Sequence, residues 1–404
     1  MLAILALFRG SLTTLSGIGE LRLVSSSEIA GGEKPLADLH VAPAEGQVPS
    51  TREIHITRRR AVQLSEEQLV AFEPFVSMGP AGQTGQATPW PLVAKRRDAE
   101  VGAEVDLVEW TKRNRAVIDA KLYHSGALLF RGFDTSTLDA FKSFSRALSD
   151  KLDGYDERTS PRKDLGDNVF TSTIYPKDQP LHFHNANSYS TFWPMKIWFG
   201  CIIKSPIGGR TPLADCRRVP DFIDPGLLAR FEKTGVRYLR NFMPGIGLSW
   251  QETFGTDSKA EVEAYCAHEE IEYEWVSPTH LRTVQVRPAL ATHPITNERV
   301  WFNQASLFHV SMLKGGIAER FREDFPEDHL PSNSYFGDGT PLSKGELDAI
   351  QEAYDRASLR FDWEVGDIAL LDNMLIAHAR EPFDGDRLIT VAFSGRHTHG
   401  PWKA

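Results

Sequence analysis

Hydrophobic and polar positions along the chain follow two periods, one helical and one extended. From residue 106 to 124 apolar residues recur at helical spacing, as do those from 138 to 152, and Gly126 ends the first of these patterns. The continuous apolar run over 127–130 predicts a buried strand. Further strands are predicted over 195–203, 281–286, 368–371 and 388–393, and further helices over 227–233, 259–270 and 344–358.

This order of elements predicts a mainly β fold with surrounding helices, of the α+β class. Many short strands are separated by Gly and Pro turns, and helices lie between them. A double-layered β core of jelly-roll type suits that arrangement, because each layer then buries its apolar face against the other. No internal repeat is present.

The first 60 residues carry little periodic patterning. Ser25–Ser27 and Gly31–Gly32 lie within them, and globular patterning begins near Leu64. We therefore expect residues 1–60 to be a poorly ordered extension and residues 61–404 to form one domain. The apolar start over 1–8 is short and lacks a basic segment before it, and no apolar run reaches the ~20 residues that a membrane span needs. A cytoplasmic protein without membrane contact is expected.

Charge and cysteine content argue against several classes of function and of structural site. The formal net charge is −9, which argues against non-specific electrostatic binding of nucleic acid by the protein as a whole. Three scattered cysteines, Cys201, Cys216 and Cys266, are too few for a disulfide framework or a thiolate metal cluster, so buried thiols are expected.

The segment around His184 carries the candidate chemistry. Non-heme iron(II) oxygenases hold the metal with two histidines and one carboxylate on one face, and the first two ligands usually appear as His-x-Asp or His-x-Glu. Here Ala186 stands at the carboxylate position, and its methyl group cannot bind a metal. A second histidine, His378, follows an apolar strand and a turn, and Arg387 opens the next strand. An arginine at a strand mouth suits bidentate capture of a carboxylate.

Together these residues resemble the TauD/TfdA-type iron(II)- and 2-oxoglutarate-dependent dioxygenases, most closely the SyrP-like members. The resemblance covers residues 107 to 393, roughly three quarters of the chain. It is carried by the segments 126–133 (Gly-Ala-Leu-Leu-Phe-Arg-Gly-Phe), 171–176 (Thr-Ser-Thr-Ile-Tyr-Pro), 208–215 (Gly-Gly-Arg-Thr-Pro-Leu-Ala-Asp), 301–304 (Trp-Phe-Asn-Gln), 335–339 (Tyr-Phe-Gly-Asp-Gly) and 378–387.

The resemblance implies a distorted double-stranded β-helix with Fe(II) at its mouth. His184 and His378 match the family's two metal-binding histidines. Arg387 and Thr211 match the residues that hold the distant carboxylate of 2-oxoglutarate. The departure is Ala186, because the subgroup usually reads His-Asn-Glu where this chain reads His-Asn-Ala.

Three interpretations of the missing carboxylate remain open. In the first, the protein is a radical halogenase, since such enzymes carry Ala or Gly here and chloride or bromide takes the free position. In the second, it is an oxygenase in which Asn185, Asn187 or His182 replaces the ligand; His182 and His184 would face the same side of an extended strand. In the third, the protein has lost redox chemistry and binds a ligand or partner.

The substrate is constrained only by resemblance. SyrP-like proteins often act on amino acids, free or tethered to a carrier protein, in natural-product pathways. We therefore expect a small amino-acid-like substrate, with O₂ as co-substrate.

Overall fold

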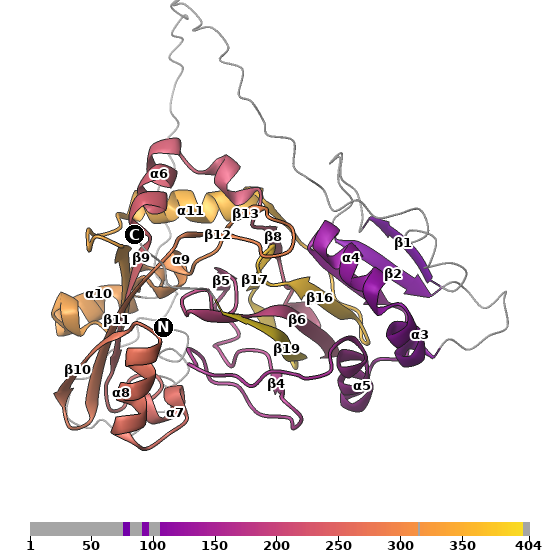
Figure 1. Ribbon diagram of the computed structural model, residues 1–404, viewed down its shortest axis with the longest axis horizontal. Helices are drawn as coiled ribbons and strands as arrows, with labels where there is room; N and C mark the ends of the chain where they lie inside the picture. The colour runs from indigo at the N-terminus through magenta and orange to yellow at the C-terminus, as the bar shows by residue number, and fades with distance from the viewer. Residues whose placement is uncertain (1–75, 81–90, 97–105, 314–315, 399–404) are drawn as a thin grey trace, which may run out of the picture.

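The computed structural model describes residues 76–80, 91–96, 106–313 and 316–398 (Figure 1). The expected extension over 1–60 lies outside the described residues. The helices are α3 (Leu107–Arg113), α4 (Arg115–Ser125), α5 (Leu138–Leu148), α6 (Pro225–Thr234), α7 (Trp250–Phe254), α8 (Lys259–His268), α9 (Ala305–Phe308), α10 (Ile317–Asp324) and α11 (Lys344–Arg356), with short 3₁₀ turns at Val219–Phe222, Val310–Met312 and Glu327–His329.

Among the described residues seven strands form the main sheet. Their order is β1 (Val76–Pro80), β2 (Leu92–Arg96), β3 (Ala127–Arg131), β16 (Ile368–Asp372), β6 (Phe192–Ile203), β19 (Leu388–Thr398) and β4 (Val169–Thr171). All neighbours pair antiparallel except β2 and β3, which run parallel. The strands predicted from the sequence at β3, β6, β16 and β19 are confirmed.

Both faces of β3 in the main sheet are buried, which explains its uninterrupted apolar run. In β3, Leu128 and Phe130 belong to one apolar cluster, whereas Ala127 and Leu129 belong to another. The first cluster also contains apolar residues of α3, α4 and α5, which lie beside this end of the sheet in Figure 1. Alternate side chains of a strand point to opposite faces, so a strand covered on both sides needs no polar positions.

A four-stranded second sheet packs on the other face of the main sheet. Its order is β15 (Ser358–Leu359), β8 (Leu213–Asp215), β17 (Ile376–Arg380) and β5 (Leu181–His184). Leu213, Ile376 and Ala377 of this sheet share one buried cluster with Phe199 and Ile389 of the main sheet. The two layers give the expected jelly-roll core, and the candidate site lies between them.

A third sheet joins the core at one side. It contains β10 (Glu272–Ser277), β11 (His280–Arg287), β9 (Val236–Phe242) and β14 (Ser332–Phe336), with α7 and α8 next to it in Figure 1. Two short pairs complete the described strands: β12 (Leu290–Thr292) with β13 (Arg299–Trp301), and β18 (Phe383–Asp384) with β7 (Ile207–Gly208).

The helix predicted over 106–124 is two helices rather than one. Asn114 separates α3 from α4, and its side-chain amide donates to the carbonyl oxygen of Trp110 at 2.8 Å. This bond competes with regular helix geometry. Gly126 ends α4 in the left-handed conformation at φ 80°, as expected. No helix in the described part of the chain is long and apolar enough to cross a bilayer.

Candidate active site

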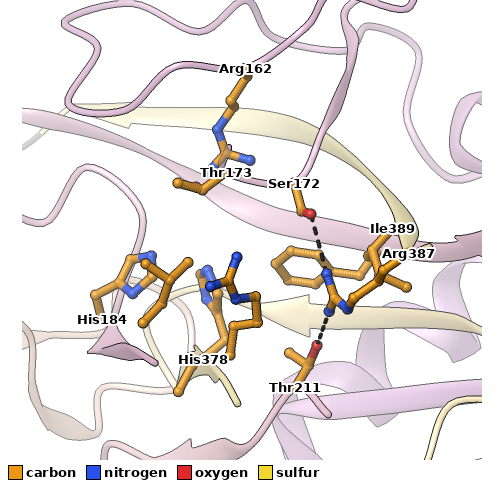
Figure 2. A pocket seen from close by; sticks show the side chains of 12 residues that line it. Arg162, Ser172, Thr173, His184, Thr211, His378, Arg387 and Ile389 are labelled. Carbon is orange, nitrogen blue, oxygen red and sulfur yellow. Dashed lines mark hydrogen bonds between the residues drawn. The ribbon is translucent and has the colours of Figure 1, made fainter. Parts of the chain in front are cut away.

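The two candidate histidines meet across a pair of neighbouring strands. His184 ends β5 and His378 lies in the middle of β17, and the two are antiparallel partners. Their ring centroids are 4.4 Å apart, and Figure 2 shows them side by side. Nδ1 of His184 lies 2.9 Å from the carbonyl oxygen of His182, which can only accept. Nδ1 of His184 therefore carries the proton, and Nε2 keeps a free lone pair.

Both imidazoles are neutral at neutral pH. Burial lowers the pKa of His184 to about 4 and that of His378 well below its ordinary value. The neutral ring is the form that binds metals. Nδ1 of His378 is buried, and no group of the described chain hydrogen-bonds to it. Two neutral nitrogen donors with an unpartnered atom between the sheets fit a divalent metal ion.

Asn373 fixes the segment after His184 to the turn before His378. Its side-chain oxygen accepts from the backbone N–H of Ala186 at 2.8 Å, and its side-chain amide donates to the carbonyl oxygens of Ala186 and Pro194 at 2.9 Å each. The carbonyl oxygen of Asn373 accepts from the Asn185 side chain at 2.6 Å. The backbone at position 186 is therefore held at both its N–H and its C=O.

The histidines open into a cavity between the two sheets. It encloses about 380 Å³ of empty space, open solvent at its mouth included. The residues that line it are Arg162, Ser172, Thr173, Leu181, His184, Phe199, Thr211, His378, Ala379, Arg380, Arg387 and Ile389 (Figure 2). Three of these side chains are arginines and none is a carboxylate, so the cavity suits anions.

Arg387 and Thr211 lie together at one end of the cavity, as the sequence predicts. The Arg387 guanidinium donates to the carbonyl oxygen of Gly209 at 3.0 Å and to the hydroxyls of Ser172 and Thr211 at 3.4 Å (Figure 2). Thr211 also accepts from the indole N–H of Trp363 at 3.0 Å. Because its oxygen already accepts from two donors, the hydroxyl proton of Thr211 is free to donate to a carboxylate.

The glycine pair before Thr211 makes room for this arrangement. Gly209 has φ 74°, and a Cβ there would lie 3.1 Å from Cδ and Nε of Arg387. Gly208 has φ 65°, and its Cβ would lie 2.3 Å from the carbonyl oxygen of Pro382. The Gly-Gly-x-Thr segment therefore lets the chain turn closely past Arg387.

Arg162 and Arg380 are cavity residues that the sequence does not single out. Arg380 donates to the carbonyl oxygens of Tyr175, Pro176 and Gln179 at 3.1, 2.6 and 2.7 Å. Burial lowers the pKa of Arg380 to about 10, and burial together with the charge of Arg380 does the same for Arg387. Both guanidinium groups remain charged at neutral pH. The sequence could have indicated Arg380, because it lies two residues after the candidate ligand His378.

The proposed replacements for the carboxylate do not line the cavity. Asn185 donates to Asn373 and to the Cys216 sulfur, and Asn187 lies at a separate hollow with Asp156. Nδ1 of His182 lies 3.1 Å from Gln351 of α11.

The expectation that His182 faces the same side as His184 is therefore wrong. The pairing of β5 with β17 shifts register between His378 and Arg380, so strict alternation fails there. Ala186 itself is buried and does not line the cavity. In the part of the chain that the structure describes, no group of three or more His, Cys, Asp or Glu side chains could hold a metal ion.

Comparison with known families identifies the family of the chain. The family model "Taurine catabolism dioxygenase TauD, TfdA family" matches residues 87–393. The chain therefore belongs to the TauD/TfdA family of iron(II)- and 2-oxoglutarate-dependent oxygenases, which act on small molecules with O₂.

Individual relatives cover most of the chain. It is 40% identical over 275 residues to the dapdiamide synthesis protein DdaC of Enterobacter agglomerans, covering 68% of this chain and 84% of that protein. It is 28% identical over 296 residues to a clavaminate synthase-like protein of Arabidopsis thaliana, covering 70% of this chain and 85% of that protein. Among solved structures, PvcB of Pseudomonas aeruginosa superposes with a TM-score of 0.46 at 13% identity, over 82% of this chain and 93% of that chain.

Proposed function

We propose that this protein uses Fe(II) and 2-oxoglutarate to functionalise a C–H bond of a small amino-acid-like substrate, and that the product is halogenated. His184 and His378 would hold the metal, and Arg387 with Thr211 would hold the distant carboxylate of 2-oxoglutarate. When bound, the metal and 2-oxoglutarate would supply, with O₂, the oxidising chemistry needed to functionalise a C–H bond. The observation that carries the proposal is a neutral histidine pair in a cavity that offers arginines and no carboxylate.

Electrostatics favour a halide over a protein ligand at this site. A carboxylate at position 186, which members of the subgroup usually carry, would bring one negative charge beside the metal. Here the lining side chains bring positive charge from Arg162, Arg380 and Arg387 and no negative charge. Chloride or bromide would supply both the missing charge and the missing ligand.

An oxygenase with a replacement ligand is less well supported. The side chains of Asn185 and His182 are engaged with Cys216, Asn373 and Gln351, and Asn187 lies at another hollow. Water at the free position would give hydroxylation instead, and this is the second candidate. The amino-acid-like substrate is supported by the name of the 40% identical relative, a dapdiamide synthesis protein.

A substrate-free titration tests the halide proposal. Under anaerobic conditions, Fe(II) and 2-oxoglutarate should give the visible charge-transfer band of the bound pair. Chloride and bromide should shift this band in the wild type and leave it unchanged in Ala186→Glu, because the new carboxylate fills the position. Ala186→Gly, which adds no ligand, is the matched control and should respond as the wild type does.

Each outcome of this titration separates two interpretations. A halide shift of equal size in Ala186→Glu would refute halide binding at this position. A band without any halide response would favour hydroxylation. Absence of the band at saturating Fe(II) and 2-oxoglutarate would favour the binding-protein interpretation. Once a substrate is known, product mass in chloride and then bromide should show the corresponding halogen.

A further inference from the structure

The three arginines of the cavity have different surroundings. Arg387 contacts Gly209, Ser172 and Thr211 at the end assigned to 2-oxoglutarate. Arg380 uses its terminal nitrogens on three backbone carbonyls. Arg162, on the segment before β4, forms no ion pair with a carboxylate among the described residues, and it donates a hydrogen bond to a backbone carbonyl.

Arg162 is held in place by aromatic faces rather than by an ion pair. Its guanidinium carbon lies 4.9 Å from the centre of the Tyr155 ring and 5.5 Å from that of Phe393. One terminal nitrogen donates to the carbonyl oxygen of Thr171 at 3.3 Å, and Nε is buried without a hydrogen-bond partner. Stacking of this kind orients a guanidinium while leaving its charge uncompensated.

Figure 2 places Arg162 at the top of the cavity and Thr211 at the bottom, with His184 and His378 toward the left of the view. Arg162 lines the same cavity as His184 and His378. The distal carboxylate of 2-oxoglutarate belongs at Arg387, at the other end. An anion of the substrate is therefore the natural counter-charge for Arg162.

We propose that Arg162 binds a carboxylate of the substrate, and that the substrate is consequently a free carboxylic acid rather than an amino acid held on a carrier protein. An amino acid attached as a thioester has lost its α-carboxylate and would leave Arg162 unpaired in the cavity wall. This inference rests on the proposed function, because it assigns the substrate end of the same site.

The test compares free acids with their primary amides. The wild-type enzyme with Fe(II) and 2-oxoglutarate, without O₂, is mixed with each of the standard L-amino acids and with the corresponding amide. Binding is measured as a perturbation of the charge-transfer band. At least one acid should bind, and its amide should bind about 10- to 100-fold more weakly, as expected for loss of a charge-assisted pair.

Three variants test whether Arg162 causes the preference for free acids over amides. Arg162→Gln should abolish the preference for acid over amide, and Arg162→Lys should restore part of it because the charge returns. Lys163→Gln removes one charge from the exposed neighbouring side chain and should keep the preference. An unperturbed charge-transfer band and unchanged 2-oxoglutarate affinity in Arg162→Gln show that the variant is folded.

Failure of this proposal differs from failure of the proposed function. If the band forms but no acid perturbs it, or if Arg162→Gln keeps the preference for acids, the carboxylate assignment is overturned while the cofactor assignment stands. If an aminoacyl carrier protein perturbs the band and the free acids do not, the substrate is tethered and the proposal is wrong. If the band never forms in the wild type, the proposed function itself fails.

Discussion

At the scale of single residues, the site depends on which donors and acceptors are already used. Thr211 accepts from Trp363 and Arg387 and so has only its proton to offer. His184 gives its Nδ1 proton to a backbone carbonyl and so has only a lone pair to offer. Each side chain therefore has one available role: Thr211 can donate a hydrogen bond to an anion, and His184 can bind a metal.

We expect Thr211→Val to weaken 2-oxoglutarate binding by about tenfold, because one hydrogen bond to a charged group is lost. Isothermal titration with Fe(II) present measures this affinity. Thr211→Ser keeps the hydroxyl and should bind as the wild type does. Equal affinity in Thr211→Val would remove Thr211 from the 2-oxoglutarate site. The indole N–H of Trp363 also loses its acceptor in this variant, which should cost about 1 kcal/mol of folding stability.

His309 should make the fold sensitive to acid. Its Nδ1 accepts from the backbone N–H of Ser311, and burial, aided by the charge of Arg322, lowers its pKa from 6.5 to about 4. The unfolded chain therefore binds the proton more readily. The free energy of unfolding should fall by about 3 kcal/mol as pH drops from 6.5 to 4, with no contribution above pH 7. Denaturant unfolding of His309→Asn, which keeps an acceptor without titrating, should lack this component.

At the scale of elements, the sequence predicts the strands well and their local irregularities poorly. The runs at β3, β6, β16 and β19 are recognisable because burial on both faces makes them continuously apolar. The break at Asn114 depends on one side-chain hydrogen bond, and the orientation of His182 depends on a register shift in the pairing of β5 with β17. Neither irregularity changes the spacing of hydrophobic residues from which helices and strands are predicted.

The candidate site shows the same division. His184, His378, Arg387 and Thr211 come from four separate segments, and the sequence motifs place all four at one cavity. Arg162 was not expected there, because its partners are aromatic faces and a backbone carbonyl that no sequence spacing encodes. Packing around the cavity, rather than any motif, brings it to the site.

The clamp made by Asn373 belongs to this scale, since it joins the end of β5 to the turn between β16 and β17. Asn373→Ala should lower the free energy of unfolding by about 2–4 kcal/mol, because buried groups of Ala186 and Pro194 lose their partners. Asn373→Asp keeps the acceptor for the Ala186 N–H but sets a carboxylate against two carbonyls, so it should also destabilise. Both variants should bind Co(II) more weakly. Unchanged Co(II) affinity would show that the clamp does not position His184.

At the scale of the whole molecule, a buried carboxylate connects the third sheet to the site. Glu157 accepts from Ser190 at 2.7 Å and from Tyr265 of α8 at 3.0 Å, and it lies 3.4 Å from Arg240 of β9. Ser190 lies only a few residues after His184 in the sequence. The third sheet is thereby tied to the same stretch of chain that carries His184.

Glu157→Gln should lower the free energy of unfolding by about 3 kcal/mol, because Arg240 would remain as a buried charge without a counter-ion. Denaturant unfolding measures the loss. The double variant Glu157→Leu with Arg240→Met removes both charges and should be more stable than Glu157→Gln. If the double variant is the less stable of the two, the unpaired charge of Arg240 is not the cause of the loss in Glu157→Gln.

The contacts of Arg380 bear on how this protein could acquire new substrates. Its guanidinium donates hydrogen bonds to three main-chain oxygens of the segment from Tyr175 to Gln179, and its central carbon lies 5.6 Å from the centre of the Tyr175 ring. Any residue presents the same main-chain oxygens, so side chains of this segment other than that of Tyr175 can be exchanged without losing the hydrogen bonds to Arg380. Residues 176–179 can therefore vary under selection or in a mutant library while the backbone hydrogen bonds to Arg380 keep the path of the chain.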